Sequence, residues 1–155
     1  MQPIRILISA LLIAITPMSA GAMQCGRGPA PEEKVKRMLI SGVEAWNQGN
    51  LEKFMRGYWR SPDLTFFSEG DIRKGWERTL LRYRQRYQGE ARKMGQLELR
   101  GLKIDLLSCR AAAVTGQWEL SFEDGRKPHG LFTLVVKRMN RGWRIVHDHT
   151  SEAGA

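Results

Sequence analysis

The sequence predicts an α+β domain, in which helices pack on one face of a mostly antiparallel sheet. The first half of the chain carries helix-periodic apolar patterns with one short strand among them, and the second half carries four segments rich in β-branched and aromatic residues. Helices that precede a run of strands are typical of the α+β class. The 155 residues allow one domain, or two at most, and the 42% of apolar residues exclude an intrinsically disordered chain.

Residues 1–22 have the pattern of a secretory signal peptide. A start that carries Arg5 is followed by an apolar run over residues 6–15, and an Ala-Gly-Ala end lies at 20–22. The apolar run is too short to span a bilayer comfortably, which takes about 20 residues. We therefore expect cleavage after Ala22, a periplasmic or secreted product, and no stable membrane insertion after cleavage. A retained membrane anchor is the alternative.

Residues 23–31 are rich in Gly and Pro and are expected to form a flexible linker. This linker contains Cys25, and Cys109 is the only other cysteine of the sequence. Disulfides persist in the oxidising space outside the cytoplasm. A bridge between the two would close a loop of about 85 residues and contribute about 4–5 kcal/mol to stability. The alternative is an unbridged Cys25 in the linker and a buried Cys109.

The domain itself is expected over residues 32–151, and it begins with two helices. Glu32 and Glu33 follow Pro31, and acidic residues in the first turn favour a helix start. One helical face then carries apolar and small residues at i, i+4, i+7 and i+11 spacing: Val35, Leu39, Gly42 and Trp46. Asn50 can cap a second, short helix.

A short strand over residues 64–68 and a long helix over residues 72–88 follow, separated by a turn at 69–71. The helix is predicted from an apolar stripe that consists of Ile72, Trp76, Leu80, Tyr83 and Tyr87. Its arginines spread around the remaining circumference and are expected to form a solvated face. Because the tyrosines lie within the apolar stripe, they are not available to stack on bases, and we expect no nucleic-acid partner.

Residues 96–107, 110–122, 130–138 and 142–150 are predicted as strands, and the last three as consecutive antiparallel hairpins. Residues 152–155 are expected to be a disordered tail. Side chains alternate between the two faces of a strand. In the last strand, this rule places Trp143, Ile145, His147 and His149 on one face and Arg144, Val146, Asp148 and Thr150 on the other.

The pair His147 and His149 allows three interpretations. It could be an acid–base pair in a pocket, since histidine titrates near neutral pH. It could be half of a metal site, which a carboxylate such as Glu119 or Asp63 would have to complete. It could also hydrogen-bond buried groups and only shape a pocket. The sequence assigns no metal and no cofactor.

Several aromatic residues are candidates to line a pocket for an apolar ligand. They are Tyr58, Trp59, Phe66, Trp76, Tyr83, Trp118 and Phe132. At these spacings aromatic residues also form ordinary core, and a domain of about 120 residues needs some of them there.

Four segments resemble the nuclear transport factor 2-like superfamily, which includes ketosteroid isomerase-like and SnoaL-like polyketide cyclase proteins. They are Ala45-Trp46-Asn47-Gln48-Gly49-Asn50-Leu51, Tyr58-Trp59, Gly75-Trp76-Glu77, and the closing run Gly142-Trp143-Arg144-Ile145-Val146-His147-Asp148-His149-Thr150-Ser151. The resemblance covers about residues 32–151. The resemblance implies a cone-shaped, curved sheet that wraps around the helices and encloses a pocket. It also implies a homodimer, since homodimers are common in that superfamily.

Members of that superfamily include isomerases, dehydratases, cyclases, epoxide hydrolases and binding modules. Its isomerases use a carboxylate base, but neither Asp63 nor Asp105 has a local motif that marks it as one. We therefore expect an exported, SnoaL-like protein that binds a small apolar or amphipathic molecule. The alternative is a cofactor-independent isomerase, dehydratase or cyclase in which His147 and His149 transfer protons. The sequence leaves open whether the protein is an enzyme.

Overall fold

A computed structural model describes residues 25, 28–88 and 94–154. The elements follow one another as α1 (Pro31–Asn47), α2 (Leu51–Met55), β1 (Thr65–Ser68), β2 (Asp71–Lys74), α3 (Trp76–Tyr87), β3 (Gln96–Ser108), β4 (Ala111–Ser121), β5 (His129–Met139) and β6 (Gly142–Glu152). The α+β prediction is confirmed. The predicted signal peptide over residues 1–22 lies outside the described residues, as do residues 23, 24, 26 and 27 of the predicted linker.

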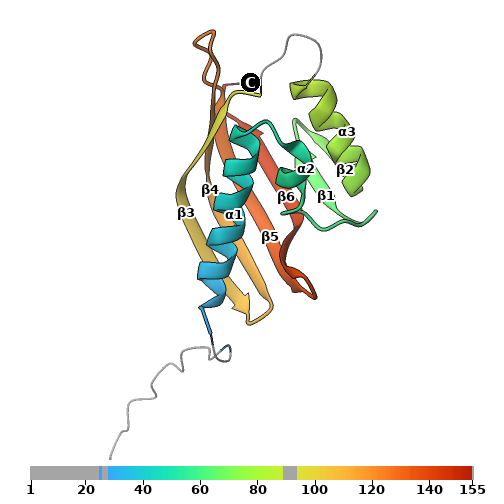
Figure 1. Cartoon of the computed structure of the whole chain (residues 1–155), viewed down its shortest axis with the longest axis vertical. Helices are drawn as coiled ribbons and strands as arrows, with labels where there is room; N and C mark the ends of the chain where they lie inside the picture. The colour runs from blue at the N-terminus through green and yellow to red at the C-terminus, as the bar shows by residue number, and fades with distance from the viewer. Residues whose placement is uncertain (1–24, 26–27, 89–93, 155) are drawn as a thin grey trace, which may run out of the picture.

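Six strands form one curved, open sheet in the order β2-β1-β6-β5-β4-β3. β1 runs parallel to β6, and every other neighbouring pair is antiparallel, so the sheet is mostly antiparallel as predicted. Figure 1 shows α1 lying across the long strands, with α2 and α3 beside it towards β1 and β2. The three helices therefore cover one face of the sheet, and no described helix covers the opposite face.

Polar side chains at the end of α1 fix this helix and the next one. The side chain of Asn47 donates to the Leu97 carbonyl (3.0 Å) and accepts from the Leu97 N–H (2.7 Å), so it joins the end of α1 to β3. Asn50 caps α2 as predicted, because its side-chain oxygen accepts from the Lys53 N–H at 2.9 Å.

The predicted start of the long helix at Ile72 is wrong. Residues 71–74 form β2, which pairs with β1 through a two-residue turn in which Glu69 and Gly70 have φ values of 55° and 78°. Two positive φ values in succession are typical of the tight turn that joins antiparallel strands. Gly75, with φ of 97°, then ends the strand, and α3 starts at Trp76. Ile72 is 65% exposed on the outer face instead of buried in a helical stripe.

The predicted division of the last strand into two faces is also wrong beyond Val146. Val135 pairs with His147 and Val136 pairs with Ile145, so Val146 is an extra residue, a β-bulge, in β6. One extra residue shifts every later side chain to the other face. β6 also continues to Glu152, which pairs with Gly130 and is not part of a tail.

Cys25 and Cys109 form a disulfide, with their Cα atoms 5.1 Å apart. Of the two alternatives, the bridged one is therefore confirmed. The bond ties the segment before α1 to the turn between β3 and β4 across 84 residues of sequence.

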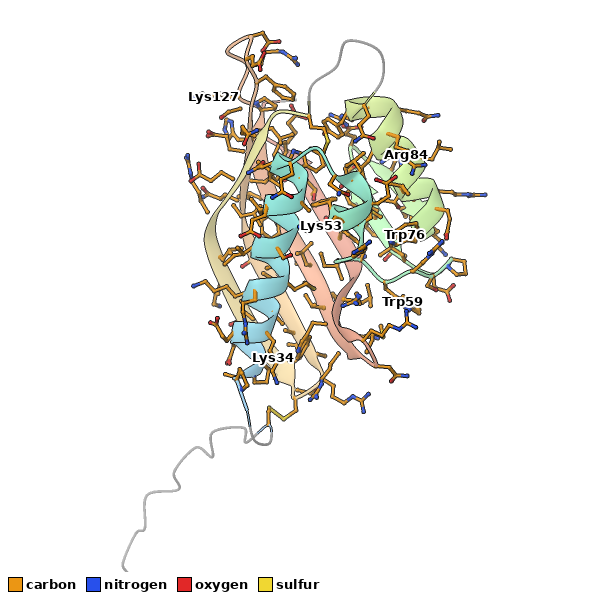
Figure 2. All side chains as sticks on the ribbon, viewed as in Figure 1. Lys34, Lys53, Trp59, Trp76, Arg84 and Lys127 are labelled. Carbon is orange, nitrogen blue, oxygen red and sulfur yellow. A yellow bond between two sulfur atoms is a disulfide. The ribbon has the colours of Figure 1, made fainter. Side chains whose placement is uncertain are left out.

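Trp59 and Trp76, two of the predicted pocket residues, lie where the segment that follows α2 meets the start of α3 (Figure 2). The Trp59 N–H donates to the Ile145 carbonyl at 2.8 Å. The Trp76 indole donates to the Met55 carbonyl at 2.9 Å, and 9% of the residue is exposed. Among the described residues, no helix is long and apolar enough to cross a membrane.

Candidate functional site

A cavity of about 170 Å³ lies between the inner face of the sheet and the three helices. One water needs about 10–15 Å³ of such space, so the cavity has room for a small organic molecule. Its walls are mostly apolar and come from every layer of the fold, among them Leu39 and Trp46 of α1, Phe54 of α2, Leu99 of β3 and Phe132 of β5.

The carboxyl group of Asp148 lies in this apolar wall and is almost completely buried, with 4% of the residue exposed. The Tyr58 hydroxyl donates to one of its oxygens at 2.8 Å, and the Thr150 hydroxyl donates to the other at 2.7 Å. Each carboxyl oxygen has two lone pairs, so each retains acceptor capacity after these bonds. A ligand in the cavity can reach this capacity.

Two features of the backbone place the carboxyl and its tyrosine partner. The bulge at Val146 turns Asp148 inward, opposite Phe66 of β1 and Leu134 of β5. An isolated parallel bridge between Tyr58 and Ile145 holds the segment after α2 against β6. The partners in the hydrogen bond are therefore set by backbone pairing, although 90 residues separate them in the sequence.

Burial raises the pKa of Asp148 to about 6, although the hydrogen bonds from Thr150 and Tyr58 act in the opposite direction. Burial also raises the pKa of Tyr58 well above its ordinary value, and Asp148 and a hydrogen bond with Tyr83 add to this effect. Burial likewise holds the pKa of Tyr83 high, so both phenols remain protonated donors near neutral pH. A carboxyl that titrates near pH 6 can both accept and release a proton at physiological pH.

The structure brings five of the seven predicted pocket residues to the cavity. They are Tyr58, Phe66, Tyr83, Trp118 and Phe132. Trp59 and Trp76 are not among the lining residues, because they pack at the joint between α2 and α3 described above. The prediction that they line the pocket is wrong.

The structure places His147 and His149 on the outer face of the sheet, away from the cavity. His147 Nδ1 lies 2.7 Å from the Thr65 hydroxyl, and the ring of Phe67 packs edge-on against both imidazoles. Burial and the neighbouring His149 lower the pKa of His147. The prediction that they share a face with Ile145 is wrong, because it assumed an unbroken alternation through Val146.

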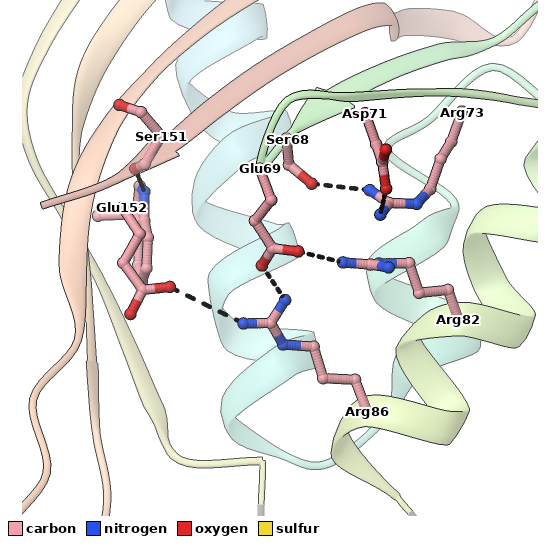
Figure 3. A network of polar contacts seen from close by, with 9 residues as sticks. Ser68, Glu69, Asp71, Arg73, Arg82, Arg86, Ser151 and Glu152 are labelled. Carbon is pink, nitrogen blue, oxygen red and sulfur yellow. Dashed lines mark hydrogen bonds and ion pairs between the residues drawn. The ribbon is translucent and has the colours of Figure 1, made fainter. Parts of the chain in front are cut away.

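At its more exposed end the cavity is lined by five charged residues, which we call the rim: Glu69, Arg73, Arg82, Arg86 and Glu152. Arg82 and Arg86 both donate to Glu69, and Arg86 forms an ion pair of 3.8 Å with Glu152 (Figure 3). Arg73 donates to the Ser68 hydroxyl at 2.9 Å and to Asp71 at 2.7 Å. Arg82 and Arg86, expected on a solvated face, are partly exposed and also line the cavity.

Sequence reasoning missed Asp148 as a site residue, together with Thr150 and the rim. A signal for Asp148 was present, since an acidic residue within the β-branched and aromatic run of a buried strand is unusual. It was assigned to the outer face because a bulge has no local sequence signature. Asp63, Asp105 and Glu119, considered as carboxylates from the sequence, are not among the cavity's lining residues.

The arrangement can bind an apolar molecule, hydrogen-bond one polar group at Asp148, and move a proton there. Within residues 25, 28–88 and 94–154, no three side chains of His, Cys, Asp or Glu gather closely enough to hold a metal ion.

Comparisons with known proteins agree with this architecture. The family model described as the SnoaL-like domain matches residues 35–154. An NTF2-like protein of unknown function from Shewanella oneidensis is similar in structure, with a TM-score of 0.72 and 36% identity, over 78% of this chain and 98% of that one.

More distant structures show the likeness of fold alone. An NTF2-like superfamily protein from Salmonella enterica has a TM-score of 0.62 at 18% identity, over 81% of this chain and 92% of that one. A domain of unknown function with a cystatin-like fold from Nostoc punctiforme has a TM-score of 0.68 at 18% identity, over 83% of this chain and 81% of that one. The comparison with curated proteins gave no match.

Proposed function

This chain belongs to the SnoaL-like domain family of the NTF2-like superfamily, and on that premise we propose that it binds a small apolar or amphipathic molecule in its cavity. The observation that carries the proposal is a buried carboxyl, Asp148, set in an otherwise apolar and aromatic wall. Binding sites for small molecules typically combine such walls with few polar groups that fix the orientation of the ligand.

The energetics of the cavity support this function. Burying a charge-forming group in an apolar wall is unfavourable, and a fold under selection for stability alone gains nothing from Asp148 there. A ligand with a hydroxyl or carbonyl group offers Asp148 and Tyr58 a further partner and covers the surrounding rings. The apolar part of such a ligand gains about 25 cal/mol for each Å² that it removes from water.

Binding of 1-octanol, followed by calorimetry, tests this proposal. Leu99 of β3 lines the cavity, and its neighbour Glu98 lies on the opposite face of the strand. We expect Leu99→Trp to weaken octanol binding at least about tenfold by filling the cavity, and the matched Glu98→Trp to leave it unchanged. Equal affinities in the two variants, or no binding to the unaltered protein, would contradict the proposal.

A second candidate function is cofactor-independent proton transfer, and the raised pKa of Asp148 favours it. Asp148 takes the place of the histidine pair in this candidate. It would remove a proton from carbon next to a carbonyl group and return it elsewhere, while Tyr58 donates a hydrogen bond to the carboxyl. In the isomerisation of a β,γ-unsaturated cyclic ketone, the proton leaves the α carbon for Asp148, the double bond shifts, and Asp148 returns the proton to the γ carbon, so the reaction needs no oxidant, reductant or leaving group.

That isomerisation, followed by ultraviolet absorbance, tests the second candidate. We expect Asp148→Asn to abolish it and His147→Gln, on the outer face, to leave the rate within about twofold. A His147→Gln variant that loses all activity while Asp148→Asn retains it would restore the histidine interpretation and reject Asp148.

We propose further that the protein is exported to the periplasm or secreted. The signal-peptide pattern of residues 1–22 supports this location, and so does the disulfide between Cys25 and Cys109, because such bonds persist in oxidising compartments.

We also propose a homodimer formed through the outer face of the sheet, with a second copy of this chain as the partner. Ile72 and Leu131 expose 65% and 60% of their surfaces there, next to Phe67 and His149. A face that combines exposed apolar side chains with an aromatic ring is typical of an interface between subunits. Sedimentation of the purified protein should give a dimer, and Leu131→Lys should shift it towards monomer.

A further inference from the structure

We propose that the bound molecule carries an anionic group, a carboxylate, and that Arg82 and Arg86, with Arg73 beside them, bind it at the rim of the cavity. This inference rests on the proposed binding function and names its ligand class as an amphipathic carboxylic acid. The acid group would lie at the rim, and the apolar part would extend inward towards Asp148.

The position of the arginines supports this orientation. Asp148 is nearly completely buried, whereas the side chains of Arg73, Arg82 and Arg86 are 21%, 34% and 41% exposed. The cavity therefore opens at the arginines. Beyond them a wider outer groove shares Arg86, Tyr87 and Trp118 with the cavity, so a ligand has a continuous path.

The rim holds more hydrogen-bond donors than its own carboxylates use. Three guanidinium groups meet the carboxylates of Glu69 and Glu152, and Asp71, outside the cavity lining, accepts from Arg73. Each guanidinium has five N–H donors, and a single carboxylate, Glu69, accepts from both Arg82 and Arg86. Glu152 reaches Arg86 only at 3.8 Å, which is beyond hydrogen-bond distance. Donors are thus available at the rim for a further carboxylate, and Arg binds carboxylates in pairs of parallel hydrogen bonds.

The Glu69 carboxylate shows how a carboxylate can bind to Arg82 and Arg86. Glu69 is the one residue other than glycine that has a positive φ among the described residues, 55°. This left-handed conformation is unfavourable for a residue with a side chain, and in the turn between β1 and β2 the Glu69 carboxylate accepts from two arginines of α3 (Figure 3). The Glu69 carboxylate occupies the site from within the chain, and a ligand carboxylate competes with it.

The dimensions agree with an acid of moderate length. Asp148 and Glu152 are four residues apart on β6, which corresponds to about 13 Å along a strand. Thr150, opposite Ser68 and Phe132, lies between them on the inner face. An extended chain of eight carbons is shorter than this distance, so octanoate fits between the rim and Asp148 and is the probe.

The experiment compares octanoate with 1-octanol and octylammonium by calorimetry on the same protein. We expect octanoate to bind at least about tenfold more tightly than octanol, and octylammonium more weakly than either, since hydrogen bonds between a guanidinium group and a carboxylate are about twice as strong as neutral ones. In the double variant Arg82→Gln/Arg86→Gln, octanoate should fall to the affinity of octanol, and octanol should be unaffected. Arg78→Gln, exposed on the same helix and outside the cavity lining, is the matched control and should change nothing.

Glu69→Gln separates ligand binding from structural ion pairing. Removing the internal competitor should tighten octanoate binding several-fold and leave octanol unchanged, whereas a purely structural network would give weaker or unchanged octanoate binding and a lower midpoint of urea unfolding. Octanoate that binds no better than octanol to the unaltered protein would overturn the carboxylate inference and leave the proposed function standing. Failure of all three probes to bind would overturn both.

Discussion

At the scale of single residues, the chemistry of this protein centres on Asp148. Its carboxyl is held by two hydroxyl groups, Tyr58 and Thr150, in a wall that is otherwise apolar. Because burial outweighs these hydrogen bonds, the folded protein holds the proton on Asp148 to a higher pH than the unfolded chain does. The same residue therefore offers a polar contact inside the cavity and makes stability depend on pH.

Replacing Asp148 by Asn should remove this pH dependence. The folded pKa of about 6 lies above the ordinary value of 3.8, so the unfolded chain loses the proton first as the pH rises. The unaltered protein should therefore lose stability between about pH 4 and 6, by about 3 kcal/mol in all, and stay at that lower level above pH 6. Asp148→Asn should lack this loss. Urea unfolding at pH 4 and pH 7 measures it, and parallel pH profiles for the two proteins would contradict the assignment.

At the scale of elements, one extra residue in β6 decides which side chains enter the cavity. The alternation of apolar and polar residues is clear in the sequence of this strand, and it predicts the correct inner residues up to Ile145. After the bulge at Val146, the same pattern gives the wrong face for Asp148 and for His149. The start of the long helix is also predicted wrongly from a local pattern. Ile72 fits the apolar stripe of the helix, but in the structure it lies in β2 and pairs with Phe67 of β1.

Deleting Val146 tests the importance of the bulge. The deletion would place Asp148 two positions after Ile145, so strict alternation then keeps Asp148 inward and His147 and His149 outward. We therefore expect the variant to keep the pH dependence of stability that Asp148 confers, which urea unfolding at pH 4 and pH 7 measures; loss of that dependence would show that the bulge itself is needed to place Asp148. The matched variant Val146→Ala keeps the bulge and should lose about 1 kcal/mol or less.

Trp76 links the start of α3 to the end of α2, and replacing it by Ala measures how much this contact contributes to the free energy of unfolding. Its ring is packed in the core at the start of α3, and its indole N–H donates to the end of α2. Trp76→Ala should destabilise the protein by about 3–5 kcal/mol in urea unfolding. A loss below about 1 kcal/mol would show that α3 is not anchored at this residue.

At the scale of the whole molecule, the disulfide links the segment before α1 to the far end of the β3–β4 hairpin. Cys109→Ser should lower stability by about 4–5 kcal/mol, because the unfolded chain regains the freedom of a loop of 84 residues. Urea unfolding with and without a reductant measures the effect. The reductant should lower the stability of the unaltered protein to that of the variant and should leave the variant unchanged.

The proposed export can be tested on the mature chain. Protein recovered from the periplasm or culture medium should begin at Met23, and its intact mass should lack residues 1–22 and two hydrogen atoms. A full-length chain found in the membrane fraction would instead support the retained anchor.

The sequence by itself determined the fold class, the order of most elements, the two candidate cysteines of a disulfide and most of the aromatic cavity wall. These follow from apolar periodicity, turn residues and a cysteine count, all of which are local or one-dimensional properties. The tertiary structure alone decided which polar groups meet: Asp148 with Tyr58, and Arg82 and Arg86 with Glu69. The physical reason is that a bulge and a two-residue turn, each a matter of one or two residues, set the direction of every side chain that follows them.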